Sequence, residues 1–204
     1  MPRTRKAPVA GRVFVVSAPS GGGKTTVVAR LLRRMPTLVR SVSVTTRPPR
    51  PGERPGKDYR FISPAAYQRL RRAGDLLEYA KVHGASYGTP KRPVERALRQ
   101  GRDVILSIDV QGARKIRRAL GRQAVLVFLL PPSMAQLRRR LLQRRTDTAA
   151  AIRRRLTAAR RELACAAWYD YRIVNDRLDR AVDALAAVIA GSRPSAVRRR
   201  QRSS

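Results

Sequence analysis

A glycine-rich segment, Ala18-Pro-Ser-Gly-Gly-Gly-Lys-Thr25, contains the residues best suited to chemistry in this 204-residue chain. Consecutive glycines let successive main-chain N–H groups face one anion, and the positive end of a following helix strengthens that site. Lys24 can reach the terminal phosphates of a nucleoside triphosphate, and the Thr25 hydroxyl can ligate Mg²⁺. The residues that we expect at the triphosphate are Ala18, Pro19, Ser20, Gly21, Gly22, Gly23, Lys24, Thr25 and Thr26.

The flanking segments fit the strand–loop–helix context that such a loop requires. The β-branched stretch 12–17 predicts a strand, and the apolar spacing of 24–35 predicts a helix that ends before Pro36. Similar patterns predict strands at 41–45, 59–62, 76–82, 103–108, 124–130 and 171–174. Helices are predicted between Ser63 and Gly74, at 92–100 and 112–120, from Ser133 to a break at 146–148, onward to Ala167, and at 178–190.

Alternating strands and helices predict an α/β fold with a mostly parallel central sheet flanked by helices. The short strands of 42–91 interrupt that alternation and predict an inserted lobe. The expected division is a core of 11–41, 92–133 and 161–191, a helical lid of 134–160, and disordered basic tails at 1–10 and 192–204.

The charge balance is strongly basic, with 46 Lys and Arg against 13 Asp and Glu and a net charge of +33. Such a chain attracts phosphate in any form, but charge does not say which anion binds. Arginine far outnumbers lysine, which biased genome composition could also produce, so we expect a solvated basic surface without a specific nucleic-acid partner. Apolar runs too short for a membrane helix or a signal peptide predict a cytoplasmic protein. Cys165 is the single cysteine, which excludes an intramolecular disulfide.

Further segments, taken in order, resemble guanylate kinases, and the resemblance covers residues 12 to about 190. They are Ser43-Val-Thr-Thr-Arg-Pro-Pro-Arg-Pro-Gly52, Gly56-Lys-Asp-Tyr59, Leu77-Glu-Tyr-Ala80, Gly84-Ala-Ser-Tyr-Gly-Thr89, Ile108-Asp-Val-Gln-Gly112, Leu130-Pro-Pro-Ser133 and Ile173-Val-Asn-Asp176. The resemblance implies transfer of the γ-phosphoryl group of ATP to GMP with Mg²⁺, in purine nucleotide metabolism. It also implies that 42–91 is a GMP-binding lobe and that 134–160 closes over ATP.

The same resemblance assigns roles to individual residues. Catalytic roles fall to Lys24, Arg47, Arg144 and Arg155. Arg47, Arg50 and Tyr59 are expected at the GMP phosphate with Tyr87 beside it, and Ser43, Glu78, Thr89 and Asp109 around the guanine. Arg140, Arg144 and Arg155 are expected at the ATP phosphates, and Asn175 on the adenine side.

The chemistry of these side chains agrees with the resemblance. Arg47 and Arg50 lie three residues apart in a proline-rich loop, which suits two guanidinium groups directed at one phosphate. An ionised Glu78 would accept from both the ring N–H and the amino group of guanine, whereas adenine presents an acceptor there. Phosphoryl transfer depends mainly on positioning and charge neutralisation, so we assign no general base.

Three departures from the family pattern are visible. Ala18 stands in place of the first glycine of the phosphate loop, Ser107 replaces a usual acid, and Gln143 and Arg145 flank Arg144 in place of glycines. Other hypotheses remain open: a P-loop kinase with a different acceptor, a non-catalytic interaction module, or a nucleic-acid binder. An intact Lys24 and Thr25 disfavour the module, and the lack of aromatic–basic interleaving disfavours the nucleic-acid binder.

Overall fold

The computed structural model describes residues 11–82, 84–143 and 149–192. In these residues five parallel strands form the central sheet, in the order β2-β7-β1-β8-β9. The strands are β1 (Val13–Ser17), β2 (Val39–Arg40), β7 (Val104–Ser107), β8 (Ala124–Leu130) and β9 (Tyr171–Val174). β1 is fully buried between β7 and β8, as its unbroken apolar sequence predicts for a central parallel strand.

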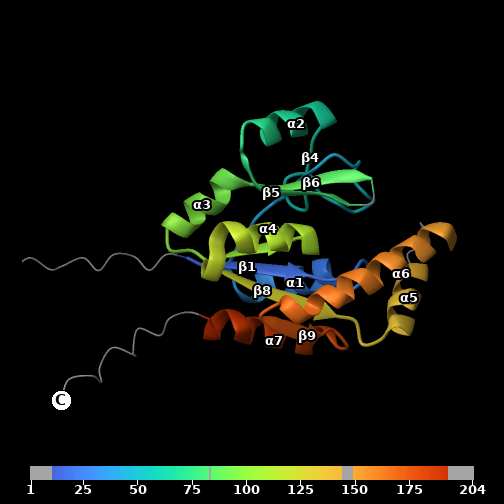
Figure 1. Cartoon of the computed structure of the whole chain (residues 1–204). Coiled ribbons are helices and arrows are strands. Elements are labelled where there is room, and N and C mark those ends of the chain that lie inside the picture. The colour runs from blue at the N-terminus through green and yellow to red at the C-terminus, as the bar shows by residue number, and fades with distance from the viewer. Residues whose placement is uncertain (1–10, 83, 144–148, 193–204) are drawn as a thin grey trace, which may run out of the picture.

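Helices cover both faces of this sheet because successive side chains of β1 point to opposite sides. Phe14 and Val16 pack in a cluster with α1 (Lys24–Arg34) and α7 (Leu178–Gly191). Val13 and Val15 pack on the other face with α3 (Lys91–Arg99) and α4 (Val110–Leu120). The predicted α/β fold with a mostly parallel sheet is therefore confirmed (Figure 1).

A second sheet, in the order β4-β3-β6-β5, forms a lobe on the side of the molecule where α3 and α4 lie (Figure 1). Helix α2 (Pro64–Arg72) covers this lobe, and the Ser63 hydroxyl caps it by accepting from the Ala66 N–H. The strands of the lobe are β3 (Val44–Thr45), β4 (Arg60–Phe61), β5 (Leu76–Val82) and β6 (Ala85–Pro90). The boundaries 42–91 remain a prediction for the lobe as a domain.

Two helices, α5 (Met134–Leu142) and α6 (Ala149–Ala164), extend side by side away from the central sheet (Figure 1). The Ser133 hydroxyl caps α5 by accepting from the Gln136 N–H. The predicted break at 146–148 and both basic tails, apart from residue 192, lie outside the described residues. None of the helices in the described residues is long and apolar enough to cross a membrane.

Three elements differ from the prediction. Residues 41–45 do not form one strand: β2 ends at Arg40 in the central sheet, and β3 begins at Val44 in the lobe. The chain crosses between the sheets over residues 41–43, and no local apolar pattern marks such a crossing. Strand β6 was not predicted because its sequence contains Gly88 and polar residues and lacks an apolar run. It is defined by its pairing with β5 and β3. The helix expected to reach Ala167 ends at Ala164 and continues as a 3₁₀ turn, η2 (Cys165–Trp168). A second 3₁₀ turn, η1 (Gly121–Gln123), precedes β8.

Candidate active site

The glycine-rich segment occupies the position that the sequence predicts, between the end of β1 and the start of α1. Gly21 and Gly23 have φ angles of 87° and 86°, which only glycine adopts readily. A Cβ on Gly23 would also lie 2.3 Å from Nδ2 of Asn175. The loop therefore depends on glycine both for its turn and for close packing, and it leads directly into α1.

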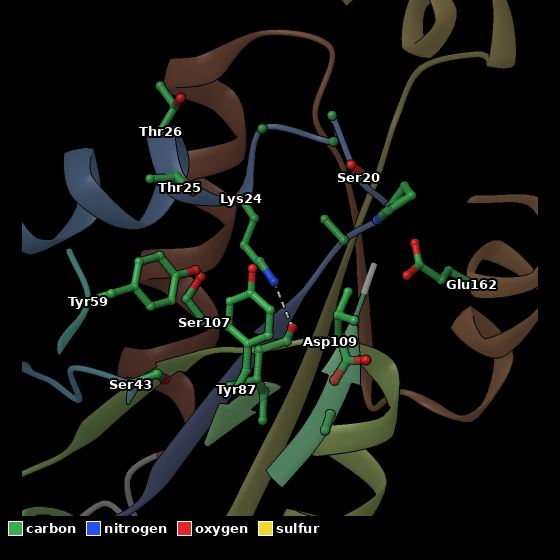
Figure 2. Close-up of a pocket in the computed structure, with 18 of the residues that line it drawn as sticks. Ser20, Lys24, Thr25, Thr26, Ser43, Tyr59, Tyr87, Ser107, Asp109 and Glu162 are labelled. Atoms are coloured by element: carbon green, nitrogen blue, oxygen red, sulfur yellow. Dashed lines mark hydrogen bonds between the residues drawn. The ribbon is translucent and has the colours of Figure 1, made fainter. Parts of the chain in front are cut away.

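A cavity of about 210 Å³ lies between this loop and the lobe (Figure 2). Residues of the loop, the lobe and the end of β7 share it, although they lie far apart in the sequence. Predicted site residues that line it are Ala18, Pro19, Ser20, Gly21, Gly22, Gly23, Lys24, Thr25, Thr26, Ser43, Arg47, Arg50, Tyr59, Glu78, Tyr87 and Asp109. The cavity is also lined by Ala80, Val82, Ile108 and Glu162, which sequence reasoning did not place at the site, and by Ser107, which it noted only as the replacement of a usual acid.

Lys24 extends into the cavity toward Asp109 and Tyr87 (Figure 2). Its ammonium group donates a hydrogen bond to the Ile108 carbonyl at 2.8 Å. Burial lowers the pKa of Lys24, and the carboxylates of Asp109, Glu162 and Glu78 oppose that shift. A cation enclosed among acidic groups at the mouth of a glycine-rich loop is suited to neutralising a bound polyphosphate.

Glu78 is the most enclosed acid of the site, with 3% of its surface exposed. It accepts a hydrogen bond from the Thr89 hydroxyl at 2.7 Å, so Thr89 contacts the site through Glu78 and does not line the cavity itself. Burial raises the pKa of Glu78 to about 7, and the nearby Asp109 carboxylate adds to the shift. The start of α4 approaches closely because residue 112 is glycine: a Cβ there would lie 2.6 Å from Glu78 Oε2.

Arg47 is held in an extensive polar network in the lobe. Its guanidinium binds both carboxylate oxygens of Glu53 at 2.7 Å, and its Nε donates to the Tyr87 hydroxyl at 3.0 Å. The hydrogen bonds with Glu53 raise the pKa of Arg47 and lower that of Glu53. Arg50 is exposed and lines the cavity together with Arg47.

Comparisons with known proteins agree with this geometry. A model of the guanylate kinase family matches residues 10–192. The chain is 51% identical over 180 residues to a guanylate kinase of Oleidesulfovibrio alaskensis, covering 88% of this chain and 87% of that protein. It is 48% identical over 183 residues to one of Thermus thermophilus, covering 90% and 82% of the two chains. The crystal structure of guanylate kinase from Anaplasma phagocytophilum superposes with a TM-score of 0.77 at 34% identity, covering 92% and 89%.

The chain belongs to the guanylate kinase family. The resemblance found in the sequence is thereby confirmed, together with the interpretation that the chain is a nucleotide kinase with a phosphate loop. The cavity joins that loop to the lobe, which is the arrangement that transfer between two phosphorylated ligands requires.

Some residues that the family resemblance assigns to ATP do not line the cavity. Asn175 lies behind the phosphate loop and donates through Nδ2 to the Gly22 carbonyl at 2.8 Å. Arg140 in turn donates to the Asn175 carbonyl at 3.0 Å. Arg155 is half-buried on α6, and Arg144 lies outside the described residues. Their contact with ATP stays a prediction.

Two acids that contact site residues, Glu162 and Glu53, were not predicted from the sequence. Glu162 faces the cavity from α6 and accepts a hydrogen bond from the Ser20 main chain, while its Oε2 is buried without a partner in the described residues (Figure 2). Burial raises the pKa of Glu162, and Lys24 opposes the shift. The signal available for both was their rarity, because each is one of only 13 acids in a chain of 204 residues.

The donor set of the site fits a magnesium ion that arrives with a triphosphate. In the described residues, no group of three or more acidic, histidine or cysteine side chains could hold a metal ion. The exposed Thr25 hydroxyl lines the cavity, and the unpartnered Glu162 oxygen lies at the same cavity. Mg²⁺ commonly takes only one or two protein ligands and completes its shell with phosphate and water.

Proposed function

We propose that the cavity binds GMP at its lobe end and the phosphates of ATP at the glycine-rich loop, and that the enzyme transfers the γ-phosphoryl group from ATP to GMP. The products are ADP and GDP. The observation that supports this most directly is that Lys24, Arg47 and Glu78 line one cavity although they come from the core and the lobe. Membership of the guanylate kinase family supports the same reaction.

On the ATP side, the main-chain N–H groups of the glycine-rich loop and Lys24 bind the β- and γ-phosphates. Lys24 exchanges its hydrogen bond with the Ile108 carbonyl for the phosphates. Arg144 and Arg155 of the lid add positive charge as transfer proceeds, with Arg140 assisting. Asn175 acts on this side by holding the loop at Gly22.

On the GMP side, Arg47, Arg50 and Tyr59 bind the phosphate and Tyr87 lies beside it. Glu78 reads the guanine: its ionised carboxylate accepts from the ring N–H and the exocyclic amine, which adenine cannot supply in that arrangement. Thr89 orients Glu78, and Ser43 and Asp109 complete the surroundings of the base. Asp109 also caps α4 by accepting from the Gly112 N–H, which fixes its place between Lys24 and the base.

Mg²⁺ bound through Thr25 and the phosphate oxygens would neutralise charge that builds up during transfer. The protein's own part is to align the two phosphates and to exclude water when the lid closes. No side chain is assigned as a general base. A cytoplasmic location and the absence of a specific nucleic-acid partner stay predictions from the sequence.

The test is a coupled assay of ADP release from ATP with GMP, AMP, CMP and UMP offered separately. We expect turnover with GMP and turnover lower by orders of magnitude with the other acceptors. Lys24→Ala is the control and should lose most of the activity. Equal turnover with AMP, or full activity of Lys24→Ala, would contradict the proposal.

A further inference from the structure

Glu53 binds Arg47 in a geometry that determines which part of the guanidinium group remains for a ligand. Nη1 donates to Oε2 and Nη2 donates to Oε1, both at 2.7 Å, so the carboxylate occupies the end of the guanidinium fork. This paired arrangement is the strongest and most directional contact that arginine makes with an acid. The side chains are 12% and 20% exposed, which weakens screening by solvent.

Four of the five N–H donors of Arg47 are therefore committed. Beyond the two that bind Glu53, Nη1 donates to the Pro48 carbonyl at 2.9 Å and Nε donates to the Tyr87 hydroxyl at 3.0 Å. The remaining Nη2–H has no partner in the described residues. It lies on the same edge of the guanidinium plane as Nε–H, and hence on the side of the Tyr87 hydroxyl.

The Tyr87 hydroxyl can donate a hydrogen bond to a ligand. Its hydroxyl oxygen accepts from Arg47, so its own proton is available to a further acceptor. Tyr87 and Arg47 both line the cavity, whereas Glu53 is outside the set of described residues that line it. Glu53 thus contacts Arg47 from behind and does not occupy the place of a ligand in the cavity.

The same carboxylate also organises the loop that carries the second arginine. Glu53 Oε2 accepts from the Arg50 main-chain N–H at 2.8 Å, and the Glu53 N–H donates to the Arg50 carbonyl at 3.0 Å. The Arg47 guanidinium lies over the Tyr59 ring, 5.1 Å from its centroid. Glu53 therefore fixes the orientation of one cavity arginine and the backbone of the other.

We propose that Glu53 is the positioning residue of the site that binds the phosphate of the acceptor. This inference rests on the proposed function. By occupying the end of the Arg47 fork, it leaves Nη2–H and the Tyr87 hydroxyl as a paired donor edge for a phosphate monoester. Glu53 does not touch the substrate and acts through Arg47 and Arg50. Its contribution concerns the phosphate of the acceptor and not the guanine or ATP.

The test compares the wild type with Glu53→Gln and Glu53→Asp, and uses Asp58→Asn as a matched control. Glutamine places an amide NH₂ against the guanidinium and removes one acceptor, whereas aspartate keeps the charge. Asp58 is an acid of the same loop region with 23% exposure, and it accepts from the Arg54 N–H. Its substitution removes the same charge without touching Arg47.

We expect Glu53→Gln to raise KM for GMP by about tenfold or more, since hydrogen bonds to charged groups contribute at about this level. KM of Glu53→Gln for ATP should stay within about twofold of the wild-type value, and its thermal midpoint should be close to that of Asp58→Asn. Glu53→Asp should recover part of the lost GMP binding. In equilibrium binding, GMP affinity should fall while guanosine affinity does not change. Asp58→Asn should leave KM for GMP near the wild-type value.

Several outcomes would overturn the inference. A lower KM for GMP in Glu53→Gln would show that the carboxylate competes with the substrate phosphate. An unchanged KM, or an equal loss of guanosine affinity, would show that Glu53 has no phosphate-specific role. If Glu53→Gln does not fold, the inference stands or fails on the GMP-to-guanosine affinity ratio of Glu53→Asp. A wild type that does not phosphorylate GMP would instead refute the proposed function.

Discussion

The Glu78 carboxylate accepts a hydrogen bond from the Thr89 hydroxyl at 2.7 Å, and the two side chains are 3% and 0% exposed. The pair spans β5 and β6, whose antiparallel register places Glu78 opposite Thr89. Thr89 supplies one hydrogen bond, but the charge of Glu78 remains poorly solvated, and its pKa rises to about 7.

This raised pKa predicts that GMP binding depends on pH. Guanine needs the ionised carboxylate, and in the free enzyme Glu78 becomes protonated as pH falls below about 7. GMP affinity should therefore decline below pH 7, by up to about tenfold per pH unit, and level off above it. Calorimetric titrations of GMP from mildly acidic to mildly basic pH would measure this, with ATP binding as the control. A GMP affinity that does not change across this range would exclude Glu78 as the residue that recognises guanine.

Protonation of Glu78, which should weaken GMP binding, should stabilise the folded state. A carboxyl with a folded-state pKa above its unfolded value of 4.5 favours the folded state when it is protonated. Its contribution to the free energy of unfolding should decrease as pH rises from 4.5 to about 7. Glu78→Gln should remove this component, which chemical denaturation of both proteins at a series of pH values would detect. A wild-type minus variant difference that does not change with pH would contradict the assignment.

Gly112→Ala tests how closely α4 must approach Glu78. The added Cβ would lie 2.6 Å from Glu78 Oε2 and 3.0 Å from its carboxyl carbon, so the carboxylate would have to move. We expect a cost of about 1–3 kcal/mol, seen mainly as a higher KM for GMP. Gly191→Ala is the control, because a Cβ there meets nothing within 4 Å. Equal kinetics for the two variants would mean that Glu78 can shift without loss of GMP binding.

Features set by local sequence were predicted well. The strands at 76–82, 124–130 and 171–174 have the predicted bounds, and Ser63 and Ser133 cap their helices. In each case a short apolar run or a capping residue marks the element in the local sequence. The phosphate loop was predictable for the same reason, since its function depends on a contiguous segment.

Features set by tertiary contact were not predictable. The division of 41–45 between two sheets depends on which strands β2 and β3 find as partners. Glu162 reaches the cavity because α6 returns to the loop at Ser20, and Glu53 matters because the lobe folds it onto Arg47. Neither of these two contacts can be predicted from the sequence alone. Asn175 illustrates an intermediate case, because the family resemblance placed it near ATP and the structure shows a contact with Gly22.

Asn175→Asp should weaken the phosphate loop from behind. The substitution replaces the Nδ2 donor with a carboxylate oxygen against the Gly22 carbonyl, at a position with 6% exposure. A lost buried hydrogen bond with an unpaired charge should cost at least about 1–3 kcal/mol of stability. We expect a higher KM for ATP, a lower melting temperature and an unchanged KM for GMP. Asp176→Asn, at the exposed neighbour, is the control, and a loss confined to GMP would refute this role of Asn175.

Arg155→Ala tests the lid assignment. Arg155 is half-buried on α6, whereas its neighbour Arg154 is exposed, so Arg154→Ala is a control with the same helix, charge and substitution. If Arg155 neutralises charge during transfer, kcat should fall by at least about tenfold while KM for GMP changes little, by analogy with arginine fingers. Arg154→Ala should keep kcat within about twofold, because a solvated arginine contributes little. Steady-state assays of both variants at saturating ATP decide the point, and an equal kcat for the two would remove Arg155 from the transfer step.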